Sequence, residues 1–118
     1  MRRSRKTDWM RRLVRENSLS SNDFILPIFV TEGKNKKIPI KTMPEVFRYS
    51  VDKLGQIVDR ALKLKIPMVA IFPQTNSGLK DSYGSEALNE NNLVCKAIRK
   101  IKDKYKNEIG IMTDVALD

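Results

Sequence analysis

Three runs of consecutive apolar residues recur along the chain, at 24–30, 67–72 and 109–113. Each has the length and composition of a strand that is buried on both faces. Between them, residues 50–65 and 89–105 repeat apolar positions every three or four residues, which is typical of an amphipathic helix. The alternation of strands and helices predicts an α/β fold with a parallel sheet and right-handed crossovers.

Residues that favour particular turns and caps set the expected limits of these elements. Ser50 and Asn89 are good N-caps for the two helices, and Pro73 is expected to stop the second strand. Residues 37–40 predict a short hairpin strand, which Pro39 confines to an edge of the sheet. The remaining segments are expected to be irregular, at 43–49, and a polar loop, at 74–88.

The chain is expected to divide into an N-terminal arm, residues 1–23, and one domain, residues 24–118. Trp9, Met10, Leu13 and Val14 fall on one face of a short helix in the arm. A short amphipathic helix with an exposed tryptophan needs a surface to pack on, and a neighbouring subunit is a plausible one. Two architectures fit the domain: a small doubly wound sheet, which the length of 118 residues favours, or the first three strands of a (β/α)₈ barrel, left incomplete.

Composition excludes several classes of protein. The sequence has 41% hydrophobic and 31% charged residues and no apolar run of about 18 residues, so we expect no membrane span. The single cysteine and the lack of a secretory signal indicate a reducing, cytoplasmic environment. The net charge of +9 is concentrated in the arm, but repeated aromatics and a nucleic-acid-reading motif are missing, so no nucleic-acid partner is expected.

Two carboxylates follow the third predicted strand. Asp114 and Asp118 stand where a strand gives way to a loop, and sheets built from strand-helix repeats carry their chemistry at the carboxyl ends of strands. A carboxylate there orients an ammonium group or binds a hard cation. The alternative is that both are ordinary acidic residues of a loop. Nucleotide-binding glycine motifs and Cys/His metal clusters are missing from the sequence.

Several motifs, in order along nearly the whole chain, resemble the N-terminal part of delta-aminolevulinic acid dehydratase (porphobilinogen synthase). They are Arg2-Arg3 with the arm 9–16, Leu26-Pro27-Ile28-Phe29-Val30 with Glu32-Gly33, Met43-Pro44, Arg48, Leu79-Lys80-Asp81, Gly84-Ser85-Glu86-Ala87, Asn89, Ala97-Ile98-Arg99, Ile101-Lys102, and Thr113-Asp114-Val115-Ala116-Leu117-Asp118.

The resemblance implies a (β/α)₈ barrel whose N-terminal arm embraces a neighbouring subunit in a homo-oligomer, usually an octamer. It implies condensation of two 5-aminolevulinate molecules to porphobilinogen, for haem and other tetrapyrroles, through two lysine Schiff bases. A lysine serves in this way when burial or a neighbouring cation lowers its pKa. Both family lysines belong to later motifs, and no lysine of this sequence stands in an equivalent context.

Two site residues carry over from the family motif. Asp114 matches an aspartate that contacts the substrate amino group. Asp118, with Ala116, occupies positions where zinc-dependent members have cysteine ligands, so cysteine-ligated zinc is not expected and oxygen ligands favour magnesium. Glu45 and Lys65 depart from the family, because glycine is common at both positions and gives the backbone more freedom.

We therefore interpret the sequence as an N-terminal fragment of a porphobilinogen synthase, inactive without the lysines. Two alternatives stay open: a truncated remnant without activity, or a small basic βαβαβ module that binds nucleic acid.

Overall fold

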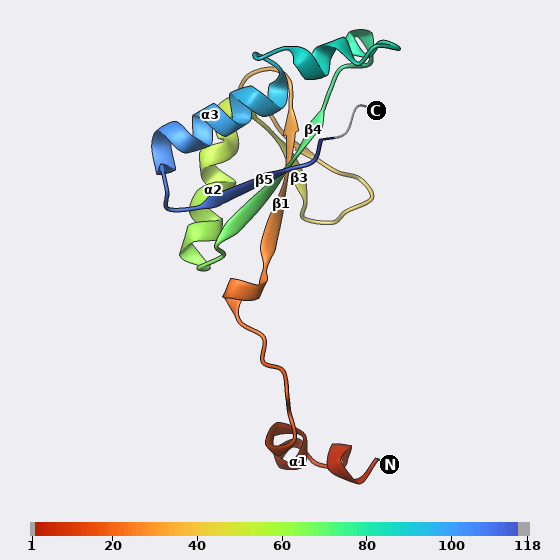
Figure 1. The fold of residues 1–118 in the computed structure, drawn as a ribbon, viewed down its shortest axis with the longest axis vertical. Helices are drawn as coiled ribbons and strands as arrows, with labels where there is room; N and C mark the ends of the chain where they lie inside the picture. Colours follow the sequence, from red (N-terminus) through yellow and green to blue (C-terminus); the bar gives the residue numbers. More distant parts are fainter. Residues whose placement is uncertain (1, 116–118) are drawn as a thin grey trace.

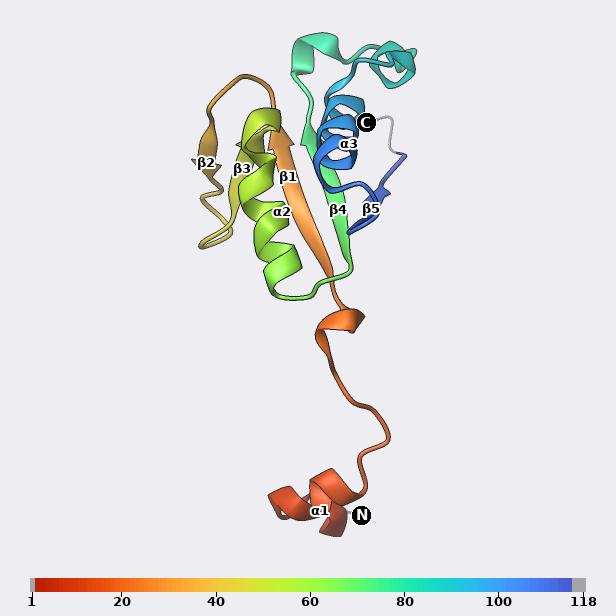
Figure 2. The same cartoon turned by 90° about the vertical axis from the view of Figure 1, so that its left-hand side faces the viewer.

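The computed structural model describes residues 2–115, which form an arm and a five-stranded sheet with two helices on one of its faces (Figures 1 and 2). The arm holds α1 (Asp8–Leu13). The strands are β1 (Ile25–Thr31), β2 (Lys37–Pro39), β3 (Phe47–Ser50), β4 (Met68–Gln74) and β5 (Gly110–Thr113), and the helices are α2 (Leu54–Lys63) and α3 (Leu93–Tyr105). Short 3₁₀ turns occupy Arg3–Arg5, Ser21–Asp23, Val51–Lys53, Ser77–Leu79 and Ser85–Leu88.

The sheet confirms the predicted strand-helix alternation. Its order is β2-β3-β1-β4-β5, and β3, β1, β4 and β5 are parallel while β2 runs antiparallel to β3. The three predicted apolar strands correspond to β1, β4 and β5, which lie side by side. β2 lies at one edge, as Pro39 predicts, and β5 forms the other edge of the described sheet.

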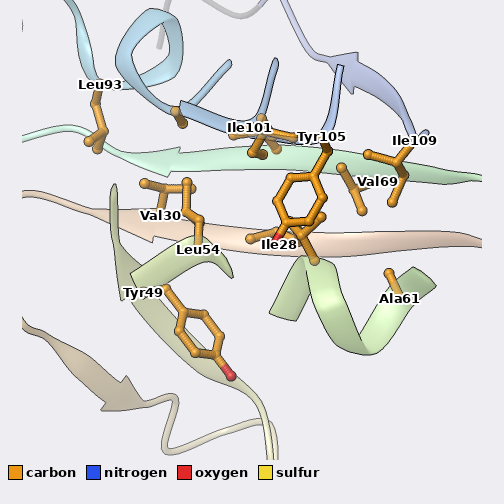
Figure 3. Close-up of a cluster of buried hydrophobic side chains, with 13 residues drawn as sticks. Ile28, Val30, Tyr49, Leu54, Ala61, Val69, Leu93, Ile101, Tyr105 and Ile109 are labelled. Carbon is orange, nitrogen blue, oxygen red and sulfur yellow. The ribbon is translucent and has the colours of Figure 1, made fainter. Parts of the chain in front are cut away.

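The core lies between the sheet and the two helices (Figure 3). Alternate residues of the central strands point towards the helices, and the apolar faces of the helices pack against them. The fully buried contributors include Ile28, Val30, Leu54, Val58, Ala61, Val69, Ile71, Ala97 and Ile101. At the C-terminal end of α3, the Tyr105 hydroxyl joins this helix to α2 by donating to Asp59 Oδ1 (2.6 Å) and the Gly55 carbonyl (3.2 Å).

The prediction that residues 43–49 are irregular is wrong for its second half, because Phe47–Ser50 form β3. The strand pairs with β1 through Phe29–Arg48, Val30–Tyr49 and Thr31–Ser50. Tyr49 is buried in the core, whereas Arg48 points to the opposite face. This strand of four residues, in which Tyr49 and Ser50 are buried, is held by these tertiary contacts, and its apolar pattern alone is too short to identify it.

Three expected boundaries also differ. β4 continues through Pro73 to Gln74, because its pairing with β5 ends at Ile71 and proline is tolerated where a strand has one neighbour. Ser50 is the N-cap of the 3₁₀ turn Val51–Lys53 that precedes α2, but its side chain makes no capping hydrogen bond, and its buried hydroxyl accepts from the Lys36 N–H (2.9 Å). The N-cap of α3 is Asn92 instead of Asn89, and its side-chain oxygen accepts from the Cys95 N–H (2.9 Å).

The arm extends away from the sheet at the amino end of β1 (Figure 1). The described chain measures 58 × 32 × 26 Å and its radius of gyration is 18.9 Å, against about 13.5 Å for a compact domain of this length. Trp9, Leu13 and Val14 remain exposed. Within residues 2–115, no helix has both the length and the apolar character to cross a bilayer.

Candidate functional site

A cavity of about 520 Å³ lies at the carboxyl ends of β4 and β5. Its walls come from these strand ends, from the segment 75–92 and from the first turns of α3. Residues from the strand ends that line it include Phe72, Pro73, Thr113 and Asp114. Because parallel strands bring their carboxyl ends to one edge, this is where the sequence predicted a site.

Asp114 lies in this cavity, as the candidate role requires. β5 pairs with β4 up to Thr113–Ile71, and Asp114 is the next residue, so the end of the strand determines where its carboxylate stands. The side chain is exposed, and an exposed carboxylate at a cavity wall is available to a cationic group of a ligand.

Asp118, the candidate metal ligand, lies outside the described residues. Among residues 2–115 no group of three or more His, Cys, Asp or Glu side chains is arranged to hold a metal ion. The described residues therefore do not complete a metal site by themselves. Cys95, the only cysteine of the sequence, is half-buried in the cavity wall.

Asp81 and Ser85 organise the loop above the cavity. Asp81 Oδ1 accepts from the backbone N–H groups of Tyr83 (3.1 Å) and Ser85 (2.9 Å). Hydrogen bonds from the side chain and backbone of Ser85 lower the pKa of Asp81 below its ordinary value, which favours the ionised carboxylate. Gly84, at φ +64°, permits the left-handed turn between them.

This turn is the part of the site that the sequence pattern did not predict, since the default for these charged and polar residues was a solvated loop. The available signal was the spacing of Asp81, Gly84 and Ser85, because aspartate commonly accepts from backbone groups two residues further on and glycine supplies a left-handed conformation. A second anchor follows it: the Asn92 side chain donates to the Glu86 carbonyl (3.3 Å) and ties the loop to the start of α3.

The cavity wall contains few lysine side chains. Among the described residues that line it, Lys80 is the only lysine. It lies in the exposed loop that follows β4. The arrangement can bind and orient a polar ligand through the exposed carboxylate of Asp114.

A mainly parallel sheet with helices on one face and a cavity at the carboxyl ends of its strands is typical of α/β proteins that bind small ligands there. Comparison with known proteins identifies the family. The model of the delta-aminolevulinic acid dehydratase family matches residues 1–118. The chain belongs to this family, which favours the two interpretations that relate it to porphobilinogen synthase over a nucleic-acid-binding module.

Individual relatives agree. The chain is 52% identical over 117 residues to the delta-aminolevulinic acid dehydratase of Bradyrhizobium diazoefficiens, covering 99% of this chain and 33% of that protein. It is 39% identical to the Chlamydia pneumoniae enzyme, with coverage of 99% and 35%. The chain therefore spans about a third of the length of these curated relatives.

A solved structure shows the same fold. The crystal structure of delta-aminolevulinic acid dehydratase from Toxoplasma gondii, in complex with the reaction product porphobilinogen, superposes with a TM-score of 0.82. The two chains are 31% identical, and the match covers 98% of this chain and 32% of the other.

Proposed function

We propose that the polypeptide to which this sequence belongs is a porphobilinogen synthase, which condenses two molecules of 5-aminolevulinate to porphobilinogen with loss of two waters. The observation that carries the proposal is the family match over residues 1–118, together with the position of Asp114 at the cavity. The Toxoplasma gondii relative, with the product bound, has the same fold over 98% of this chain.

The sheet would be the first part of a (β/α)₈ barrel. Both helices cover one face (Figure 2), while the other face presents apolar side chains, among them the contacting rings of Phe29 and Phe72 (centroids 5.8 Å apart) and the exposed Met112. β5 ends the described sheet as an edge strand. A barrel would cover this face with its interior side chains and pair the edge with a further strand.

In this barrel Asp114 would face the interior. Side chains alternate along a strand, so Asp114, two residues after Met112, continues the row on the helix-free face. Its carboxylate would bind the ammonium group of one 5-aminolevulinate and hold it against the reacting ketone. Positioning of this kind converts a bimolecular condensation into an effectively unimolecular step.

The covalent chemistry would come from the rest of the polypeptide. The family's two Schiff-base lysines belong to motifs that this sequence does not contain, so we propose that residues 1–118 alone are inactive. Asp118 would contribute an oxygen ligand to magnesium, which would supply charge stabilisation near the site. The enzyme would be cytoplasmic and homo-oligomeric, an octamer by family resemblance, with the arm 1–23 docked on a neighbouring subunit and no nucleic-acid or membrane partner.

The test is the kinetic effect of Asp114→Asn in the native-length protein, with porphobilinogen measured colorimetrically. Loss of the charge that binds the ammonium group should lower kcat/KM by about 100-fold or more, on the scale of a lost buried charge-assisted contact. Asp103→Asn, at an exposed position of α3, is the matched control and should leave kcat/KM within a factor of about two. Equal activity of the two variants would refute the role of Asp114.

A further inference from the structure

Arg48 lies on the same face of the sheet as Asp114. In the pairing of β3 with β1, Arg48 is opposite Phe29, and in the pairing of β1 with β4, Phe29 is opposite Phe72. Paired residues of parallel strands point to the same side, so Arg48 shares the helix-free face with the two phenylalanines. Their rings are in contact, with centroids 5.8 Å apart. Tyr49, the next residue of β3, is buried on the helix side.

The same register continues to Asp114. β4 and β5 pair up to Ile71 and Thr113, so the next position along the two strands is that of Phe72 and Asp114. Both of these residues line the cavity at the strand ends. A row of side chains therefore crosses the helix-free face at one level, from a cation on β3 through two aromatic rings to an anion at the end of β5.

The guanidinium of Arg48 lacks a counter-ion in the described part of the chain. The side chain is partly buried, and within residues 2–115 it makes neither an ion pair nor a hydrogen bond. Arginine stays protonated at physiological pH, and a charged group that loses its water needs an anion beside it. Closure of a barrel over the helix-free face would remove water from Arg48, which would then require an anionic partner.

The proposed substrate supplies an anion of suitable chemistry. Each 5-aminolevulinate has a carboxylate at one end and an ammonium group at the other. A carboxylate matches the planar fork of a guanidinium, which binds it through two parallel hydrogen bonds. The rings of Phe29 and Phe72, between the two charges, provide an apolar surface for the carbon chains. The row thus has a positive end, an apolar middle and a negative end.

The spacing of the strands leaves room for both substrate molecules. β3, β1, β4 and β5 are neighbours in that order, and three spacings of about 4.8 Å separate the backbones of Arg48 and Asp114 by roughly 14 Å along the sheet. The five bonds between the nitrogen and the carboxyl carbon of 5-aminolevulinate span only about 6 Å. Two molecules therefore fit along the row between the two charged side chains.

We propose that Arg48 is a substrate-binding residue, whose guanidinium binds the carboxylate of one 5-aminolevulinate while Asp114 binds the ammonium group of the other. The inference rests on the proposed function and extends it, since it adds a positive end to the site on β3. It also gives this short strand a role, because the pairing of β3 with β1 is what places Arg48 on the helix-free face.

The test uses two analogues that each lack one charge of the substrate. The compound 4-oxopentanoate has the carboxylate without the amino group, and 5-amino-4-oxopentanamide has the ammonium group without the carboxylate charge. Their inhibition constants are measured against porphobilinogen formation by the native-length protein. Arg48→Met should raise the constant for 4-oxopentanoate by about 30-fold or more and leave that for the amide within about two-fold, on the scale of a lost charge-assisted contact. Asp114→Asn should have the reverse effect.

Two further variants keep the test decisive. Arg60→Met, at an exposed position of α2, is the matched control and should leave both constants within about two-fold of the parent. Arg48→Lys keeps the charge without the planar fork and should raise the constant for 4-oxopentanoate by about ten-fold. This variant carries the test if Arg48→Met does not fold.

The outcomes separate this proposal from the proposed function. Equal increases for both analogues would mean that Arg48 pairs with an acidic side chain of the protein, and unchanged constants would mean that it binds no substrate; either result overturns the proposal. A parent protein that forms no porphobilinogen contradicts the proposed function instead. Direct binding of 4-oxopentanoate to the parent and to Arg48→Met, measured by calorimetry, then still tests Arg48.

Discussion

Lys65 stands in a conformation that favours glycine, and this makes a sharp test of the structure. Its φ is +58°. The Lys65 N–H donates to the Leu62 carbonyl (3.0 Å) and the Ile66 N–H to the Ala61 carbonyl (2.9 Å). This is the hydrogen-bond pattern of a helix that ends with a left-handed residue, a position where glycine is the usual choice because it has no Cβ.

The magnitude follows from two opposing terms. The left-handed region costs a residue with a Cβ about 1–2 kcal/mol, and glycine costs about 0.5–1 kcal/mol more than other residues in lost chain entropy. Lys65→Gly should therefore raise the free energy of unfolding by about 0.5–1 kcal/mol, which corresponds to about 2–4 °C in Tm at this length. The gain is independent of any contact of the lysine side chain.

The assay is the midpoint of urea unfolding at a fixed protein concentration. Lys65→Ala is the matched control, since it removes the charge but keeps the Cβ, and it should not raise the midpoint. Gln56→Gly, an exposed position inside α2, should lower the stability by about 1 kcal/mol. A midpoint for Lys65→Gly at or below that of the parent would refute the conformation assigned to residue 65.

Three further predictions concern other local features. Glu45→Gly should stabilise by about 0.5–1 kcal/mol in the same urea assay, because Glu45 has φ +64°; a loss of stability would contradict that turn. Asn92→Ala should cost about 1 kcal/mol by removing the cap of α3, and an unchanged midpoint would exclude the cap. In the folded protein the pKa of Asp81 is lowered from 3.8. The ionised Asp81 carboxylate therefore stabilises the fold fully above pH 3.8, and this contribution is lost as the pH falls through the lower pKa of the folded state. Asp81→Asn should remove this contribution to the acid dependence of stability, and a pH profile identical to that of the parent would contradict the prediction.

The fold could be predicted where the apolar pattern is long enough. The runs that became β1, β4 and β5 extend over several buried positions, and the helical stripes extend over about three turns, so period and burial agree. β3 was not predicted, because its formation depends on the burial of Tyr49 in the core and on pairing with β1. Both are tertiary contacts that the local sequence pattern does not contain. The predicted N-cap of α3 was Asn89 and the observed one is Asn92. Both are asparagines in a polar stretch, and local side-chain chemistry does not distinguish them.

The candidate site was predictable to the same extent. Asp114 could be placed because a strand end determines its position, whereas the Asp81 turn depends on three residues adopting one backbone shape. The sequence shows that Glu45 and Lys65 replace residues that are commonly glycine in the family. The structure explains why this costs conformational free energy, since both residues have positive φ. The proposed role of Asp118 remains a prediction, because that residue lies outside the described range.

The most direct test of the proposed function is to incubate the native-length protein with 5-aminolevulinate and magnesium, and then to add borohydride. We predict formation of porphobilinogen and a reduced adduct on a lysine beyond residue 118, with the recombinant 1–118 segment yielding neither. A folded, native-length protein that forms neither porphobilinogen nor a trapped lysine adduct, with or without magnesium, would contradict the assignment.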